Sequence, residues 1–186
     1  RDDVESRGLG DVYKRQKGHR TVVFLRNNES DYNRHSGYVV IFRESLLAHA
    51  KELGMTVIES EHYEADSFDA QHFVSTVFAH PDRPTAIINQ ANASVLSQVL
   101  MALHDAGMSI PQDVSVLSCG TYFEGEPTRF PITEMPVMPE ELCAEAMNLL
   151  VSAIEEHTDI KGSVELIEPA LKRRGSVAEA GSGGTI

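Results

Sequence analysis

Four short apolar runs recur along the middle of the chain at nearly equal intervals. They are TVVFLR at 21–26, MTVIES at 55–60, TAIINQ at 85–90 and DVSVLSC at 113–119. Their starts lie 34, 30 and 28 residues apart, which is the spacing of consecutive strand–helix–strand units. Each run is apolar without strict alternation, as is typical of parallel strands that are buried on both faces. We therefore predict an α/β fold with a doubly wound parallel sheet.

The segments between these runs contain residues that typically begin and end helices. Residues 38–53 stop before Gly54 and residues 94–106 stop before Gly107, and a glycine at this place commonly ends a helix. Residues 68–79 follow Asp66 and Ser67, which are possible N-caps. Helices of this length can cover both faces of a parallel sheet.

A further helical pattern follows the last apolar run, at residues 139–156. Pro139 suits the first helical position, and the two glutamates after it complement the helix dipole. The apolar face of this helix consists of Leu142, Ala146, Leu149, Leu150 and Ile154. Left uncovered, such a stripe predicts self-association or poor solubility. Beyond it, VELIEP and ALKRRGSVA could each add a strand.

Ligands of a doubly wound sheet bind beyond the carboxyl ends of its strands. The candidate binding loops are therefore those after Arg26, Ser60, Asn89 and Cys119. The sequence holds no GxGxxG, Walker or GxSxG motif that would specify phosphate binding or a nucleophile elbow.

Composition excludes several classes of function. With 28 acidic and 16 basic residues the net charge is −12, the opposite of what binding to a phosphate backbone requires. No apolar run approaches the roughly 20 residues that cross a bilayer. The eight histidines and two cysteines form no metal-binding pattern. We therefore predict no metal, no cofactor, no membrane segment and no nucleic-acid contact by these residues.

The two ends of the chain differ from its middle. Residues 1–16 are mostly polar without periodicity, and GLGDVYKRQ looks like translated adapter sequence, so we expect a disordered or non-native lead. Residues 179–186 are expected to be a flexible tail that is rich in glycine. The domain itself is predicted to span residues 17–178.

One residue raises an enzymatic alternative. Cys119 ends a predicted strand ahead of a glycine, where some α/β hydrolases place a nucleophile. The surrounding LSCGT lacks the paired glycines of a strained elbow, and a buried small side chain is the simpler interpretation. We therefore predict no catalytic residue and keep a Cys119-dependent hydrolase as the less favoured alternative.

Several segments, in order, resemble the effector-binding domain of LacI/GalR-family transcriptional regulators. They are GHRTVVFL from Gly18, RHSGY at 34–38, PTAIINQAN at 84–92, ALHDAGMSIPQDVSVLSC at 102–119, FPITEM at 130–135 and RRGSVA near the end. The most specific piece is AGMSIPQDVSVLS, in which a helix end, a turn and a strand follow one another. The resemblance covers about residues 18–178.

This resemblance implies a periplasmic-binding-protein-like fold of type I, of which this chain holds mainly the second lobe. It also implies a cytoplasmic homodimer that binds a sugar or other small metabolite between its lobes. Operator DNA would be contacted only through an N-terminal headpiece that this chain lacks. A periplasmic sugar-binding protein of a transporter is the alternative with the same fold.

The resemblance also points to ligand-binding residues. Arg34 matches an arginine that reaches ligand hydroxyls or a carboxylate, for which its planar fork of donors is suited. In an alternative register, Phe42 takes the aromatic position and Tyr38 that of the arginine. Asn92 matches an asparagine that binds sugar hydroxyls, although an N-cap role is about equally plausible for it.

The loop after Cys119 departs from the family pattern. Where the family commonly places aspartates that hold sugar hydroxyls, this chain has Gly120 and Thr121. Either Thr121 or Glu124 substitutes for them, or the ligand is not a typical sugar. Tyr122 and Phe123 would stack on a ring face or pack the edge of the lobe. The predicted ligand-binding set is therefore Arg34, Asn92, Thr121, Tyr122 and Glu124.

Overall fold

A single parallel sheet organises the chain. The computed structural model describes residues 18–64, 67–79, 83–119, 130–137, 139–157, 164 and 167–180. Its strands are β1 (Thr21–Leu25), β2 (Thr56–Glu59), β3 (Ala86–Asn89), β4 (Ser115–Cys119) and β5 (Thr133–Met135), in the spatial order β2-β1-β3-β4-β5. The chain thus winds to one side of β1 and then to the other, so the predicted doubly wound α/β fold is confirmed.

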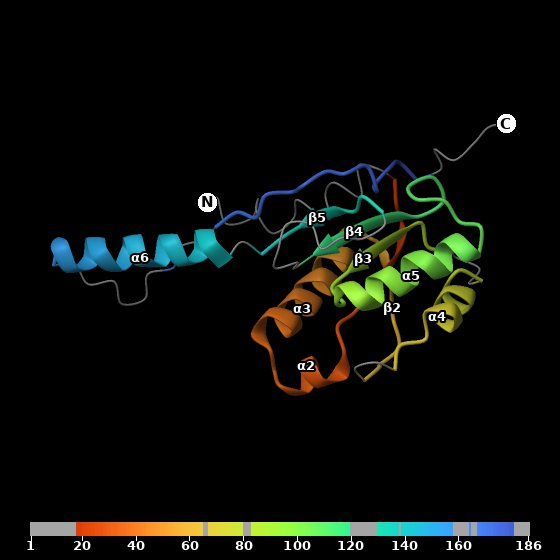
Figure 1. Ribbon diagram of the computed structural model, residues 1–186, viewed down its shortest axis with the longest axis horizontal. Helices are drawn as coiled ribbons and strands as arrows, with labels where there is room; N and C mark the ends of the chain where they lie inside the picture. The colour runs from red at the N-terminus through yellow and green to blue at the C-terminus, as the bar shows by residue number, and fades with distance from the viewer. Residues whose placement is uncertain are drawn as a thin grey trace.

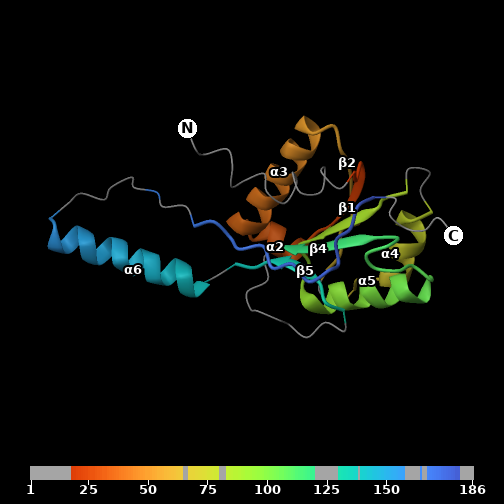
Figure 2. The ribbon, with the colours of Figure 1, turned by 90° about the horizontal axis from the view of Figure 1, so that it is seen from above.

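Helices cover both faces of this sheet (Figure 2). The helices of the described residues are α2 (Glu29–Asn33), α3 (Gly37–Glu52), α4 (Ala70–Val77), α5 (Ala93–Asp105) and α6 (Pro139–Glu155). The helix α3 lies on one face, whereas α4 and α5 lie together on the other. The proposed lead, residues 1–16, lies outside the described residues, as does most of the proposed tail.

The strands are apolar on both sides because each side meets a helix layer. Val23 and Ile87 point into the core that α4 and α5 complete, and neither is exposed. Phe24 and Ile88 point into the core beneath α3. Successive residues of a strand face opposite ways, so burial on both faces produces the continuous apolar runs that mark these strands in the sequence.

Helix α4 begins later than the sequence indicated. Its N-cap is Asp69, whose Oδ1 accepts a hydrogen bond from the backbone N–H of His72 at 2.9 Å. Ser67 instead accepts from the N–H of Glu64 at 3.1 Å, and Asp66 lies outside the described residues. The expectation of a cap at Asp66 or Ser67 was therefore wrong, because a third polar residue stands next to the helix.

The segment near the C-terminus forms hydrogen bonds with strands β4 and β5. Lys172 and Glu134 exchange two backbone hydrogen bonds, of 2.8 and 3.0 Å, in an isolated antiparallel bridge. Ser176 is buried; its Oγ donates to the carbonyl of Val116 at 2.6 Å and accepts from the N–H of Thr133 at 2.7 Å. In place of the predicted strand, ALKRRGSVA forms only an isolated bridge, and the hydrogen bonds of Ser176 attach it further to β4 and β5.

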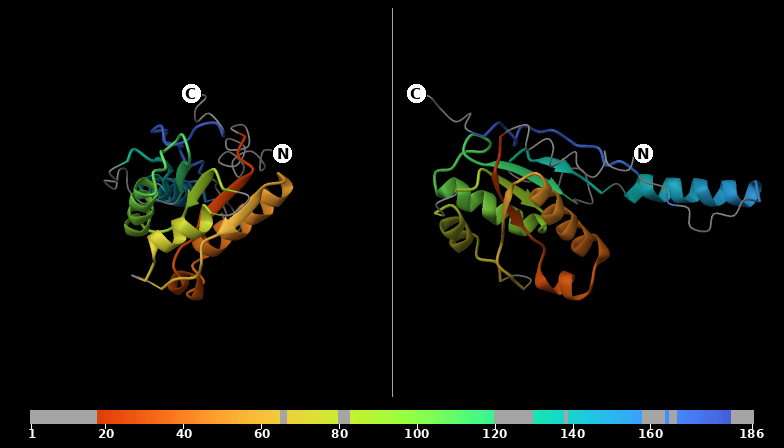
Figure 3. Two further views of the ribbon diagram at one scale, coloured as in Figure 1. Left: turned by 90° about the vertical axis from the view of Figure 1, so that its right-hand side faces the viewer. Right: turned by 180° about the vertical axis from the view of Figure 1, so that it is seen from behind.

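Helix α6 projects away from the sheet and its helices (Figures 1 and 3). Met147 and Ile154 on this helix are 58% and 63% exposed. The helix was predicted from residues 139 to 156, and the structure bears this out within one residue. No helix in the described part of the chain is long and apolar enough to span a bilayer.

We expect Ile154→Glu to reduce self-association of the chain, because it interrupts the apolar stripe of α6 with a charge. Sedimentation velocity at increasing protein concentration measures the effect. Ile41→Glu on α3 is the matched control, since Ile41 is also 63% exposed. Equal behaviour of the two variants would show that α6 is not the associating surface.

Candidate functional site

The carboxyl edge of the sheet brings together three residues from neighbouring strands. Leu25 of β1 pairs with Asn89 of β3, and Asn89 pairs with Ser118 of β4. The next residue on each strand is Arg26, Gln90 and Cys119, respectively. Because side chains alternate along a strand, these three lie in one row on the face that α3 covers. All three are buried, with 5% of each residue exposed.

Arg26 is held by a network of polar and aromatic contacts. Its Nη1 donates to Nε2 of His62 at 2.8 Å, and its Nη2 donates to a carboxylate oxygen of Glu29 at 3.4 Å. Its guanidinium lies over the ring of Tyr32, 4.2 Å from the ring centroid. His62 also donates from Nδ1 to Glu29. Since Nε2 accepts from Arg26, the proton of a neutral His62 is on Nδ1.

Two tyrosines complete the surroundings of Arg26. The hydroxyl of Tyr63 donates to the Arg26 carbonyl at 3.0 Å. Burial raises the pKa of Tyr63 to about 12, with the charge of Asp31 adding to the effect. Burial also raises the pKa of Tyr32, although Arg26 opposes this. Both phenols are therefore protonated donors near neutral pH.

Several buried polar atoms at this edge have no hydrogen-bond partner. In the part of the chain that the structure describes, they include Nε of Arg26, the Tyr32 hydroxyl, Oδ1 of Asn89 and both amide atoms of Gln90. The other amide atom of Asn89, Nδ2, donates to the Ala91 carbonyl at 3.1 Å and to Ser118 Oγ at 3.0 Å. Each such buried group without a partner costs about 1–3 kcal/mol. Their concentration here makes this edge of the sheet the candidate ligand site.

The two predicted site residues that the structure describes lie near this edge but are exposed. Arg34 follows the last residue of α2, and its N–H donates to the Ser30 carbonyl at 3.0 Å. Asn92 caps α5, and its Oδ1 accepts from the N–H of Val95 at 2.9 Å. The capping role that the sequence suggested for Asn92 is therefore present, and its Nδ2 is not used by the cap. The remaining predicted residues, Thr121, Tyr122 and Glu124, lie outside the described residues.

Sequence reasoning identified the binding loops but not Arg26 and Gln90. A signal was present, because each is a polar residue that ends a buried apolar run. What the sequence alone does not give is the lateral pairing of β1 with β3 and β4, which aligns these residues in one row.

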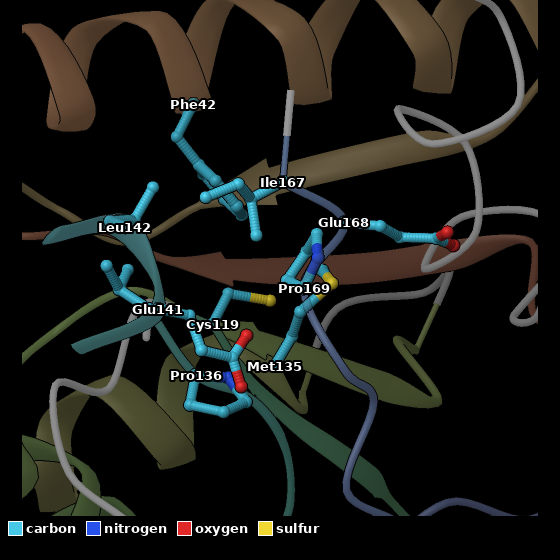
Figure 4. Close-up of a pocket in the computed structure, with 10 residues that line it drawn as sticks. Phe42, Cys119, Met135, Pro136, Glu141, Leu142, Ile167, Glu168 and Pro169 are labelled. Carbon is cyan, nitrogen blue, oxygen red and sulfur yellow. The ribbon is translucent and has the colours of Figure 1, made fainter. Parts of the chain in front are cut away.

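A pocket lies at the end of the row, around Cys119 (Figure 4). This Cys119 pocket has a volume of about 240 Å³ and is lined by Phe42, Cys119, Met135, Pro136, Val137, Glu141, Leu142, Ile167, Glu168 and Pro169. Figure 4 shows Phe42 reaching in from α3 and Leu142 from α6, while the carboxylate of Glu168 points away from the other side chains. Among the described residues of this lining, the two glutamates are the only charged ones.

Among the described residues, those around Cys119 lack the groups that a catalytic thiol needs. Such a thiol needs a base or a positive charge to form the thiolate. The residues described as lining the Cys119 pocket include neither a histidine nor a basic residue. In the same described part of the chain, no group of three or more His, Cys, Asp or Glu residues could hold a metal ion.

Solved structures with a similar fold include LacI-family transcriptional regulators. One from Bifidobacterium animalis subsp. lactis is 23% identical, with a TM-score of 0.74, over 96% of this chain and 63% of its own. A putative LacI-family regulator from Rhizobium etli is 20% identical, with a TM-score of 0.71, over 95% and 63% of the two chains. One from an Arthrobacter species, in complex with lactose, is 16% identical, with a TM-score of 0.69, over 92% and 63%.

This chain therefore spans less than two thirds of the length of these regulators. With sequence identities of 23% or less, the likeness establishes the fold. It confirms the resemblance to LacI/GalR effector-binding domains at the level of the fold. A search of curated proteins finds no match. The family model of the periplasmic binding protein-like domain matches residues 13–177. The chain accordingly belongs to the periplasmic binding protein-like domain family.

Proposed function

We propose that the chain is the ligand-sensing and dimerisation domain of a LacI/GalR-type transcriptional regulator that acts in the cytoplasm. A sugar or other small metabolite would bind at the carboxyl edge of the sheet, between this lobe and a second one. Support comes from the fold shared with LacI-family regulators and from the lactose complex of one of them. The net charge of −12 favours DNA contact through a separate headpiece rather than through these residues.

The observation that carries the proposal is the set of buried polar atoms without partners beside β1 and β3. Gln90 is central to it, because its amide offers one acceptor and two donors and uses none of them among the described residues. A ligand hydroxyl or amide can satisfy both sides of such a group at once. A ligand would shift the equilibrium between the two arrangements of the lobes only by the difference between its affinities for them.

We expect a thermal-shift screen of sugars, sugar phosphates, nucleobases and amino acids to find a compound that raises the Tm of the chain. Gln90→Leu should abolish this shift, because it removes the amide from the row. Gln98→Leu is the matched control, since Gln98 lies exposed on α5, where its amide donates a hydrogen bond to Ser94 Oγ at 3.4 Å. A shift that survives in Gln90→Leu as well as in Gln98→Leu would contradict this placement of the ligand.

Dimerisation is tested separately by light scattering of the chain with and without the compound from the screen. A homodimer is expected in both cases, because the ligand is proposed to change the angle between lobes rather than to assemble them. A monomer in both cases would contradict the dimerisation part of the proposal.

A further inference from the structure

The Cys119 pocket differs in chemistry from the polar row beside it. Eight of the ten lining residues are apolar or cysteine. The thiol of Cys119 is itself a weak hydrogen-bonding group that behaves as a small hydrophobic side chain. Over the apolar part of this lining, a polyhydroxylated ring would lose hydrogen bonds to water that the apolar side chains cannot replace.

The size of the pocket matches one ring. A cavity of about 150 Å³ with an apolar lining accommodates benzene in another protein, and this pocket has about 240 Å³. The pocket therefore has room for a six-membered ring with a small substituent.

The position of the pocket links it to the proposed ligand edge. Cys119 is the last residue of β4 and Met135 is the last residue of β5, so the pocket lies at the carboxyl ends of two strands. Cys119 also follows the residue of β4 that pairs with Asn89, which places it beside Gln90 in the row. One molecule could hence present polar atoms to Gln90 and an apolar ring to the Cys119 pocket.

We propose that the Cys119 pocket binds an apolar, ring-sized group, so that the ligand of this chain is an amphipathic molecule rather than a polyhydroxylated sugar. Glu141 in the lining favours a ring that carries no negative charge. Because Leu142 belongs to α6 and Cys119 to the sheet, the bound ring contacts both and stabilises their arrangement. The assignment of the pocket does not depend on the proposed function. Only the inference that the ligand of this chain is amphipathic rests on that function.

The test compares two molecules with the same six-carbon ring. Cyclohexanol carries one hydroxyl and myo-inositol carries six. The full chain is labelled with ¹³C at its methionine methyl groups, of which there are six. Met135 lines the pocket, whereas Met101 is 55% exposed on α5 and serves as an internal reference. Cyclohexanol should shift the Met135 methyl signal saturably and leave Met101 unchanged, and myo-inositol should shift neither.

A matched pair of variants tests the lining. Leu142→Glu places a charge in the pocket, and Leu150→Glu places the same charge elsewhere on α6, at 45% and 46% exposure respectively. Leu142→Glu should weaken cyclohexanol binding at least tenfold, and Leu150→Glu should leave it within twofold. Equal shifts of Met135 by the two ring compounds, no shift by cyclohexanol, or equal affinities of the two variants would overturn the proposal.

The outcome also separates this inference from the proposed function. If cyclohexanol binds at Met135 while the thermal-shift screen finds no ligand, the proposed function fails and the pocket assignment holds. If the screen finds a ligand that depends on Gln90 while Met135 never responds to cyclohexanol, the pocket assignment fails and the function holds.

Discussion

Phe24→Ala is expected to lower the free energy of unfolding by about 3–5 kcal/mol. Phe24 lies in β1 next to the centre of the sheet and is not exposed, and its ring centroid is 5.9 Å from that of Phe42. The substitution removes a large buried side chain, and the strands on either side restrict relaxation into the cavity. Equilibrium unfolding in urea, followed by circular dichroism, gives the difference.

Ile41→Ala provides the comparison for Phe24→Ala. Ile41 lies on α3, the helix that covers Phe24, but is 63% exposed. Its replacement should change the free energy of unfolding by less than about 0.5 kcal/mol. Similar losses in the two variants would mean that the core beneath α3 is not formed in solution.

Arg26→Met should destabilise the chain by about 2–4 kcal/mol, since it removes charged hydrogen bonds and a contact with an aromatic ring at a buried position. The side chain of Arg26 is 6% exposed and that of its partner Glu29 is 27% exposed. After the substitution, Glu29 keeps only His62 as a partner within this network. The same urea titration measures the effect.

Arg43→Met is the matched control for Arg26→Met. Arg43 also pairs with a glutamate, donating to Glu59 at 2.6 and 2.7 Å, but its side chain is 35% exposed. Solvent screening limits such a pair to about 1 kcal/mol or less. If Arg43→Met destabilised the chain as much as Arg26→Met, the network around the buried Arg26 would contribute no more to stability than a half-exposed ion pair.

The sequence predicted the main elements of the fold because they are long or strongly patterned. Strands β1 to β4 lie within the four apolar runs, and α3, α5 and α6 begin and end within one residue of their predicted ranges. Helix α2, with five residues, and strand β5, with three, were not assigned from pattern. Elements this short contain too few residues for a period of 3.6 or two to be seen.

The candidate site was predictable in place but only partly in its residues. The strand spacing located the loops after β1 and β3. A resemblance then indicated Arg34 and Asn92, and both are exposed at the ends of helices that leave this edge. Arg26 and Gln90 were not predictable as site residues, because the lack of a hydrogen-bond partner for a buried atom is a property of the folded chain.

The central claim is that this chain binds its ligand at the carboxyl edge of the sheet. Amide hydrogen exchange of the chain, with and without the compound that raises its Tm, tests this most directly. The claim predicts protection in the segments that follow β1, β2 and β3, at residues 26–34, 60–64 and 90–93. Protection confined to the opposite edge, in the segments that precede β2 and β4 at residues 53–55 and 107–114, would contradict it.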